Sequence, residues 1–183
     1  MVYILLGEGF EEVEAIAPVD ILRRVDIEAF TVSLTDDLLV RGGHGIAVMA
    51  DITLNEVAFE DIEMLVLPGG GGGVESIAGS AAAMDLILRV WSAGIKLAAI
   101  CAAPALLAKL NILNGMTVIC HPVVYEEVTA AGGNLRSELS VVTDGNLSTG
   151  KAAGTAIDFG LELVAVLRGR EVADKMRNAI FYK

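Results

Sequence analysis

Short apolar runs that alternate with amphipathic stretches constrain this chain more than any other feature of its sequence. Seven runs are candidate strands: Val2–Leu6, Ala29–Leu34, Ile46–Met49, Met64–Leu67, Leu97–Ile100, Thr117–Ile119 and Val141–Thr143. Several are continuously apolar, as is typical of strands covered on both faces. Five candidate helices lie between them: Glu12–Val25, Ala81–Trp91, Ala103–Lys109, Val124–Ala131 and Thr155–Leu167. This alternation predicts an α/β fold with an open, mostly parallel sheet and helices on both faces.

The length and the absence of linkers predict how many domains the chain forms. Its 183 residues suit one domain, and it contains no Pro/Ser-rich linker, charge block or internal repeat. We therefore expect a single domain over residues 1–183. The segment Leu38–Met49, with Gly42 and Gly43, predicts a small hairpin outside the alternation. Thr155, three residues before Asp158, is a candidate N-cap for the last helix.

Composition and charge exclude several classes of protein. Apolar residues make up 54% of the chain, but the longest apolar stretch, Leu97–Ala108, is interrupted by Pro104. A spanning helix needs about 20 apolar residues, so this stretch predicts a buried core segment and no membrane partner. The net charge of −11 argues against nucleic acid as a partner. The first residues lack the features of a signal peptide, so we expect a cytoplasmic protein with Cys101 and Cys120 reduced.

Four polar or glycine-rich segments follow candidate strands, where ligands bind in open α/β sheets. They are Gly7–Glu11, Pro68–Val74, the turn at Cys101, and His121–Pro122. The segment Gly7–Glu11 is not followed by the third glycine of a dinucleotide-binding motif, and Pro68–Val74 lacks the Gly-Lys-Ser/Thr ending of a P-loop. We therefore expect no nucleotide and no cofactor. The second segment is either a flexible loop or a nest of backbone N–H groups able to hold an oxyanion.

Cys101 has two interpretations. A lone cysteine in apolar surroundings is usually an inert core residue. Cys101, however, lies between a strand and a helix and is followed by two alanines, which is typical of a nucleophile elbow. The helix N-terminus beneath it would then lower the pKa of the thiol. Cys120 is expected in the core, because it and His121 point to opposite sides of a strand.

The two histidines and the acids of the first helix also have alternatives. His121 is either a satisfied histidine at a strand end or a general acid or base. His44 lies in a glycine-rich turn and is interpreted as solvated. The histidines and cysteines match no zinc-ligand spacing, so no metal is expected. Glu11 and Glu12 complement the helix dipole, whereas an inward Glu14 would be a buried acid that is protonated or paired.

Together these residues resemble the ThiJ/PfpI superfamily, and within it the branch of the Parkinsonism-associated deglycase and bacterial YajL. The motifs occur in family order and span nearly the whole chain: Glu11–Ala15 before Pro18–Asp20, Leu67–Gly70, Ala99–Pro104, His121–Pro122 and Gly154–Phe159. The resemblance implies a flavodoxin-like three-layer sandwich, related to the class I glutamine amidotransferase fold, which is usually a homodimer.

The resemblance also implies roles for individual residues. Cys101 matches the reactive, easily oxidised cysteine, and Glu14 matches the protonated glutamate that hydrogen-bonds its sulfur. His121 matches a nearby active-site histidine. The backbone donors expected around the thiol and the oxyanion are those of Gly69, Gly70 and Ala102. The segments around Asp20, Arg24 and His44 correspond to the part of the pocket close to the dimer interface.

Three positions, Ala102, His44 and Lys151, depart from the family pattern. Ala102 stands where the peptidase-like branch has histidine, which disfavours proteolysis, and the arrangement for glutamine amidotransfer is also absent. His44 stands where relatives often have arginine, and Lys151 where Arg or Gln is common. We expect a cofactor-independent glyoxalase III-like enzyme or deglycase that acts on glyoxal, methylglyoxal or their early adducts. The alternatives are a redox-sensing stress protein or chaperone that works through oxidation of Cys101, and a binding module with an incidental thiol.

Overall fold

A central seven-stranded sheet organises the molecule, and the computed structural model describes all 183 residues. In spatial order the strands are β10 (Val141–Asp144), β11 (Leu147–Gly150), β7 (Lys96–Ile100), β6 (Met64–Leu67), β1 (Val2–Leu6), β2 (Ala29–Ser33) and β5 (Ile52–Thr53). Every neighbouring pair is parallel except β10 and β11. The predicted mostly parallel sheet is therefore confirmed.

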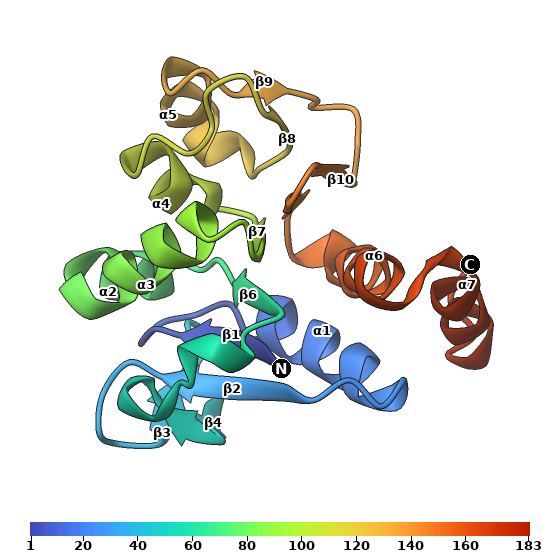
Figure 1. Ribbon diagram of the computed structural model, residues 1–183, viewed down its shortest axis with the longest axis horizontal. Coiled ribbons are helices and arrows are strands. Elements are labelled where there is room, and N and C mark those ends of the chain that lie inside the picture. Colours follow the sequence, from blue (N-terminus) through green and yellow to red (C-terminus); the bar gives the residue numbers. More distant parts are fainter.

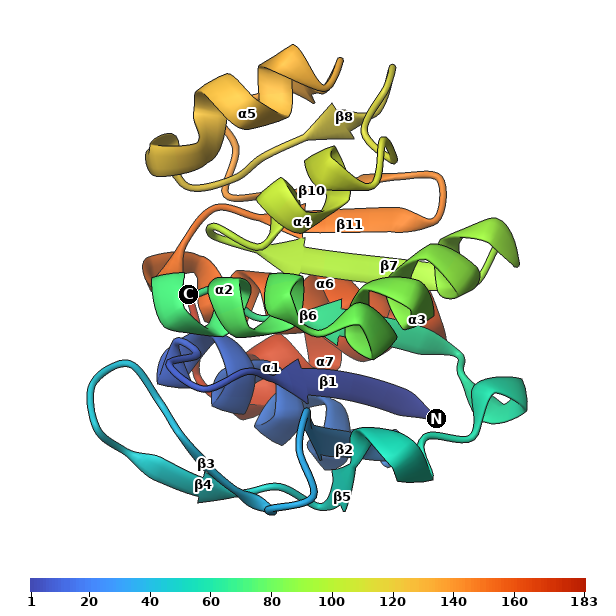
Figure 2. The same cartoon turned by 90° about the vertical axis from the view of Figure 1, so that its left-hand side faces the viewer.

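Helices cover both faces of this sheet (Figures 1 and 2). On one face lie α2 (Gly71–Gly79), α3 (Ala81–Ser92) and α4 (Pro104–Lys109). On the other lie α1 (Glu12–Arg24), α6 (Ala156–Arg168) and α7 (Arg170–Ala179). The short helix α5 (Tyr125–Ala130) lies beyond the β10 edge. None of the helices combines the length and apolar character that a membrane span requires.

Two smaller sheets flank the central one. Strands β3 (Leu39–Arg41) and β4 (Ala47–Met49) form the predicted hairpin. Strands β8 (Thr117–Val118) and β9 (Asn134–Leu135) pair separately, so the run predicted at Thr117–Ile119 does not join the main sheet. The backbone N–H of Ile119 instead donates to Thr149 Oγ1 on β11, at 2.9 Å, which attaches β8 to the sheet through a side chain.

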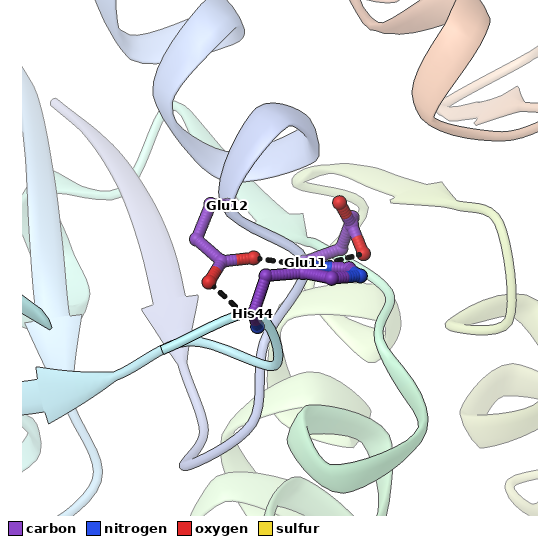
Figure 3. Close-up of side chains that lie close together, drawn as sticks. All are labelled: Glu11, Glu12 and His44. Carbon is purple, nitrogen blue, oxygen red and sulfur yellow. Dashed lines mark hydrogen bonds and ion pairs between the residues drawn. The ribbon is translucent and has the colours of Figure 1, made fainter. Parts of the chain in front are cut away.

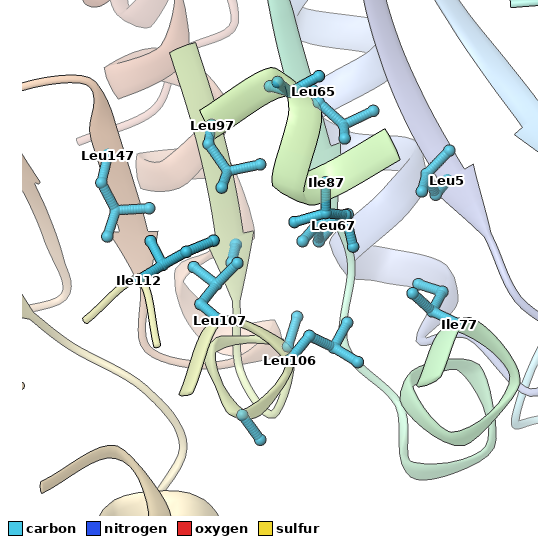
Figure 4. Packing of buried hydrophobic residues seen from close by; sticks show 14 of the residues in the cluster. Leu5, Leu65, Leu67, Ile77, Ile87, Leu97, Leu106, Leu107, Ile112 and Leu147 are labelled. Carbon is cyan, nitrogen blue, oxygen red and sulfur yellow. The ribbon is translucent and has the colours of Figure 1, made fainter. Parts of the chain in front are cut away.

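The core consists of two apolar clusters, one on each side of the sheet. Alternate residues of β1 enter opposite clusters: Leu5 lies in one, and Ile4 and Leu6 lie in the other. Figure 4 shows the first cluster, in which Leu67 lies near Ile87 of α3. Full burial of such side chains stabilises the fold by about 1.5–3 kcal/mol each. Because both faces are covered, the inner strands must be apolar at every position, which explains their continuous runs.

The sheet brings three of the four predicted loops to one edge. Since β1, β6 and β7 are parallel neighbours, the segments after them meet at their carboxyl ends. This edge is on the left of Figure 2, where α2 and the β3–β4 hairpin also lie. Within the second segment, Gly71 begins α2, so the glycine run is only partly a loop. Thr155 precedes α6, but its hydroxyl donates to Ala152 O and does not cap the helix.

Candidate active site

Cys101 occupies a sharp turn between β7 and α4, with φ of +65°. This region is strained for a residue with a side chain, and it persists where the surroundings hold the backbone. Here the backbone N–H of Cys101 donates to Gly150 O at 3.0 Å, and its carbonyl accepts from the N–H of His121 at 2.8 Å. The side chain is half-buried, so its sulfur is held at the sheet edge and stays partly accessible.

Glu14 projects from the first turn of α1 into the protein and is fully buried. Its Oε2 accepts a hydrogen bond from the N–H of Gly69 at 2.9 Å. Its Oε1 is buried and has no partner with hydrogen-bond geometry. Burial raises the pKa of Glu14 to about 7, although contact with the Cys101 thiol and the Gly69 N–H act in the opposite direction. The carboxyl is therefore poised to gain or lose a proton near neutral pH.

The Cys101 thiol does not have the lowered pKa that a helix N-terminus would produce. Burial and the adjacent Glu14 carboxylate raise its pKa to about 12, against the N–H groups of Ala102 and Gly70, which lower it. The expectation of a lowered pKa was wrong because the sulfur is largely buried and lies beside an acid. A thiolate therefore forms most readily when Glu14 takes the thiol proton, which couples the two titrations.

The glycines after β6 contribute backbone donors to this pair. The N–H of Gly70 reaches the sulfur, together with that of Ala102, whereas the N–H of Gly69 is used by Glu14. A Cβ on Gly69 would lie 2.6 Å from Glu14 Oε2 and 2.7 Å from Cys101 Cβ. Gly70 has φ of +86°, and a Cβ there would lie 2.5 Å from the backbone N of Glu11. These positions accept glycine alone, because the chain must pass close to the acid and the thiol.

His121 approaches Cys101 through its backbone. Its Nδ1 accepts a hydrogen bond from the N–H of Val123 at 3.2 Å, so the neutral ring carries its proton on Nε2. The half-exposed ring forms no hydrogen bond with the thiol. Its role as an acid or base stays a prediction. The neighbouring Cys120 is fully buried and free, as expected for a core residue.

The three residues expected close to the dimer interface do not form one cluster. Asp20 and Arg24 make an ion pair of 2.7 Å across one turn of α1. His44, in the β3–β4 hairpin, contacts Glu12 and Glu11 of the α1 start instead (Figure 3). Its ring is exposed, as expected, but it is paired, and Glu12 raises its pKa through a hydrogen bond.

Glu12 anchors the hairpin to α1. Its Oε1 accepts from the N–H groups of His44 at 2.8 Å and Ile46 at 3.3 Å, and its Oε2 lies 3.0 Å from His44 Nδ1. Burial favours the neutral form of the Glu12 carboxyl and so raises its pKa. Hydrogen bonds from its own backbone N–H and from His44 and Ile46 outweigh burial and lower the pKa to about 2. No motif could reveal this contact, because Glu12 and His44 are 32 residues apart. A carboxylate pair with an imidazole is also the set of groups here that could hold a metal ion.

Comparison with known proteins gives consistent results. Residues 1–166 match the sequence model of the DJ-1/PfpI family. Protein dj-1beta of Drosophila melanogaster is 32% identical over 177 residues, which cover 97% of this chain and 94% of that protein. A deglycase of Pyrococcus abyssi is 29% identical over 167 residues, covering 91% of this chain and 99% of that one. The structure of oxidized DJ-1 from Toxoplasma gondii aligns with a TM-score of 0.92 and 31% identity, covering 99% of this chain and 97% of the other.

Proposed function

Because the chain belongs to the DJ-1/PfpI family and has its flavodoxin-like fold, we propose that it is a cysteine enzyme that removes reactive carbonyls without a cofactor. Its membership supports a DJ-1-like, stress-related function, and one similar protein is named a deglycase. The substrates we propose are glyoxal, methylglyoxal and their early adducts. One observation carries the proposal: a partly accessible thiol faces a proton-accepting carboxyl and two backbone N–H donors.

The first step is addition of the thiol to the aldehyde. As the sulfur of Cys101 bonds to the aldehyde carbon, its proton passes to Glu14, whose raised pKa suits it to accept. The developing oxyanion is stabilised by the N–H groups of Gly70 and Ala102, and it then takes a proton to give a hemithioacetal. Glu14 holds a proton at this stage and is the nearest donor.

The later steps move one proton between carbons and release the product. Ionised Glu14, or His121, removes the proton from the carbon bonded to sulfur and returns it to the neighbouring carbon, while the hydroxyl proton of the hemithioacetal passes to the neighbouring carbonyl oxygen. This converts the hemithioacetal into a thioester of a 2-hydroxy acid. Water then cleaves the thioester, which yields the acid and restores the Cys101 thiol. No electrons are exchanged with an outside partner, so the sequence of steps needs no redox cofactor.

Formation of lactate from methylglyoxal tests this proposal. We expect turnover by the wild-type protein and its loss in Cys101→Ser. Cys120→Ser is the matched control, because Cys120 is a buried thiol in the same protein that lies outside the proposed chemistry. An equal rate of lactate formation in Cys101→Ser would refute the mechanism.

A redox-sensing role is the second candidate, and the same donors support it. A sulfinate at Cys101 would carry negative charge where the N–H groups of Gly70 and Ala102 and a protonated Glu14 can hydrogen-bond to it. Mass spectrometry after mild peroxide, alongside the lactate assay, separates the two roles. Stoichiometric oxidation with negligible turnover favours the sensor or chaperone.

We also propose that the protein acts as a homodimer in the cytoplasm. Large apolar side chains are exposed on α1 and the β3–β4 hairpin, among them Ile16, Ile46 and Met49, of which Met49 is 65% exposed. Exposed apolar side chains that gather on neighbouring elements are typical of an association site. The cytoplasmic location follows from the chemistry, because the mechanism needs Cys101 as a free thiol.

A further inference from the structure

We propose that Glu11, Glu12 and His44 form a binding site for a divalent transition-metal ion of the zinc class. The three residues bring together two carboxylates and an imidazole from the start of α1 and the turn of the β3–β4 hairpin (Figure 3). Their ligand atoms all lie within 4.8 Å of one another. This inference is independent of the proposed carbonyl chemistry, since it uses neither Cys101 nor Glu14.

The distances suit a metal ion. His44 Nδ1 lies 3.0 Å from Glu12 Oε2 and 3.5 Å from Glu11 Oε2. Zinc binds imidazole nitrogen and carboxylate oxygen at about 2.1 Å, so adjacent ligand atoms in a tetrahedral or octahedral shell lie about 3.0–3.4 Å apart. An ion placed between the three atoms would take the position in which a proton now bridges the ring and the carboxylate.

One of the ligands is already fixed in place. The Glu12 side chain is 7% exposed, and its Oε1 accepts the backbone N–H groups of His44 and Ile46. Gly42 lies against the Glu12 carboxyl so closely that a Cβ there would collide with it. These contacts orient Oε2 and keep it ionised, as the supporting hydrogen bonds of metal-binding carboxylates do.

The side chains of the other two ligands contact only other members of the cluster. The Glu11 carboxylate accepts no hydrogen bond from the protein, and the nearby His44 ring is 70% exposed. Two carboxylates and a neutral imidazole carry two negative charges, which match a divalent cation. Three protein ligands with an open side leave room for water, as in zinc sites that are not purely structural.

The experiment titrates Zn²⁺ into tag-free protein that has been treated with a chelator, and measures the heat of binding. Four variants accompany the wild type: His44→Gln, Glu11→Gln, Cys101→Ser and Glu8→Gln. Glu8 is the matched control, because it is an exposed acid of the same segment whose Oε2 already accepts the N–H of Arg41. The spectrum of bound Co²⁺ adds a readout of ligand type, because a thiolate ligand gives an intense charge-transfer band.

We expect one site in the wild type, Cys101→Ser and Glu8→Gln, with affinity reduced at least tenfold in His44→Gln and Glu11→Gln. The Co²⁺ spectrum should lack the thiolate band. Circular dichroism checks that the variants are folded; the His44 side chain is 70% exposed and that of Glu11 is 20% exposed. Absence of a site in the wild type overturns the proposal. So does a site that is lost in Cys101→Ser and kept in His44→Gln, since the metal would then bind at the thiol.

Discussion

Each member of the Cys101–Glu14 pair sets the protonation state of the other. Burial raises both pKa values, and the carboxylate raises that of the thiol further. Near neutral pH the pair holds one to two protons. Loss of the more acidic proton, at about pH 7, creates a base beside the sulfur. We therefore expect the reactivity of the thiol to follow the titration of Glu14.

The pH dependence of alkylation tests this coupling. In a Cys120→Ser background, the rate at which iodoacetamide modifies Cys101 should rise as the pH increases through about 7, because ionised Glu14 can then accept the thiol proton. The Glu14→Gln variant should lack this step and rise at higher pH, where the buried thiol alone titrates. Identical profiles centred near the ordinary thiol pKa of about 8.5 would contradict the coupling.

Glu14 should also make stability depend on pH. The folded state keeps this proton up to about pH 7, whereas an unfolded glutamate releases it near 4.5. Stability is therefore lost as the pH rises between these values, by about 3 kcal/mol. Denaturant unfolding of the wild type and Glu14→Gln at pH 5 and pH 8 measures this term. Between pH 5 and pH 8 the unfolding free energy of the wild type should fall by about 3 kcal/mol relative to that of Glu14→Gln. An equal difference between the two proteins at both pH values would show that Glu14 does not titrate in this range.

At the scale of elements, the segment between β6 and α2 is shaped by close packing. Gly73, in the first turn of α2, lies so near Phe10 that a Cβ would be 2.7 Å from its Cα. Gly70 turns the chain with a positive φ before the helix begins. The glycine run therefore brings α2 against the loop after β1 and carries the Gly70 N–H to the thiol.

Two adjacent glycines should respond in opposite ways to alanine. Gly70→Ala should destabilise the fold by about 2 kcal/mol or more, because of its positive φ and its contact with the backbone, and should reduce carbonyl turnover. Gly71→Ala should stabilise it by about 0.5–1 kcal/mol, since a Cβ there meets nothing within 4 Å and α2 begins at this residue. Unfolding in denaturant measures both changes. Equal effects would mean that the space around Gly70 is not limiting.

Elements were predictable where burial alone decided their sequence. The bounds of β1 and β6 match the apolar runs residue for residue. Strand β11 was missed because Ser148 and Thr149 look like a turn, yet both are buried and hydrogen-bonded to groups of other elements. Helix α2 was missed because glycine disfavours helices and tertiary packing overrides that preference. Helix α7 was missed because it is highly charged and buries mainly Ala173 and Met176.

The sequence predicted the proximity of Cys101 and Glu14 but not the electrostatics of the pair. The position of Cys101 after a strand marks it as a candidate, the family resemblance pairs Glu14 with it, and the structure places the two side chains together. The direction of the thiol pKa depends on burial and on the side the carboxyl faces, which sequence cannot provide. The contact between Glu12 and His44 depends on how the hairpin folds back, so no local pattern predicts it.

For the whole molecule, the apolar face of α1 and the hairpin predicts a homodimer. Light scattering should give twice the mass of one chain, and Met49→Glu should give monomers, because a charge would have to be buried in the interface. Leu88→Glu is the control: Leu88 is an exposed apolar residue on α3, which covers the opposite face of the sheet, so this variant should stay dimeric. A monomeric wild type, or equal dissociation of both variants, would contradict this assignment.

In the proposed mechanism, Cys101 forms a covalent bond with the carbonyl substrate during turnover. The most direct measurement is acid quenching of the protein while it consumes methylglyoxal, followed by peptide mass spectrometry, because acid preserves a thioester. We expect a substrate-derived adduct on Cys101 that appears during turnover and disappears when substrate is exhausted, with Cys120 unmodified. Steady lactate formation with Cys101 free throughout, and adducts confined to lysine and arginine side chains, would contradict it.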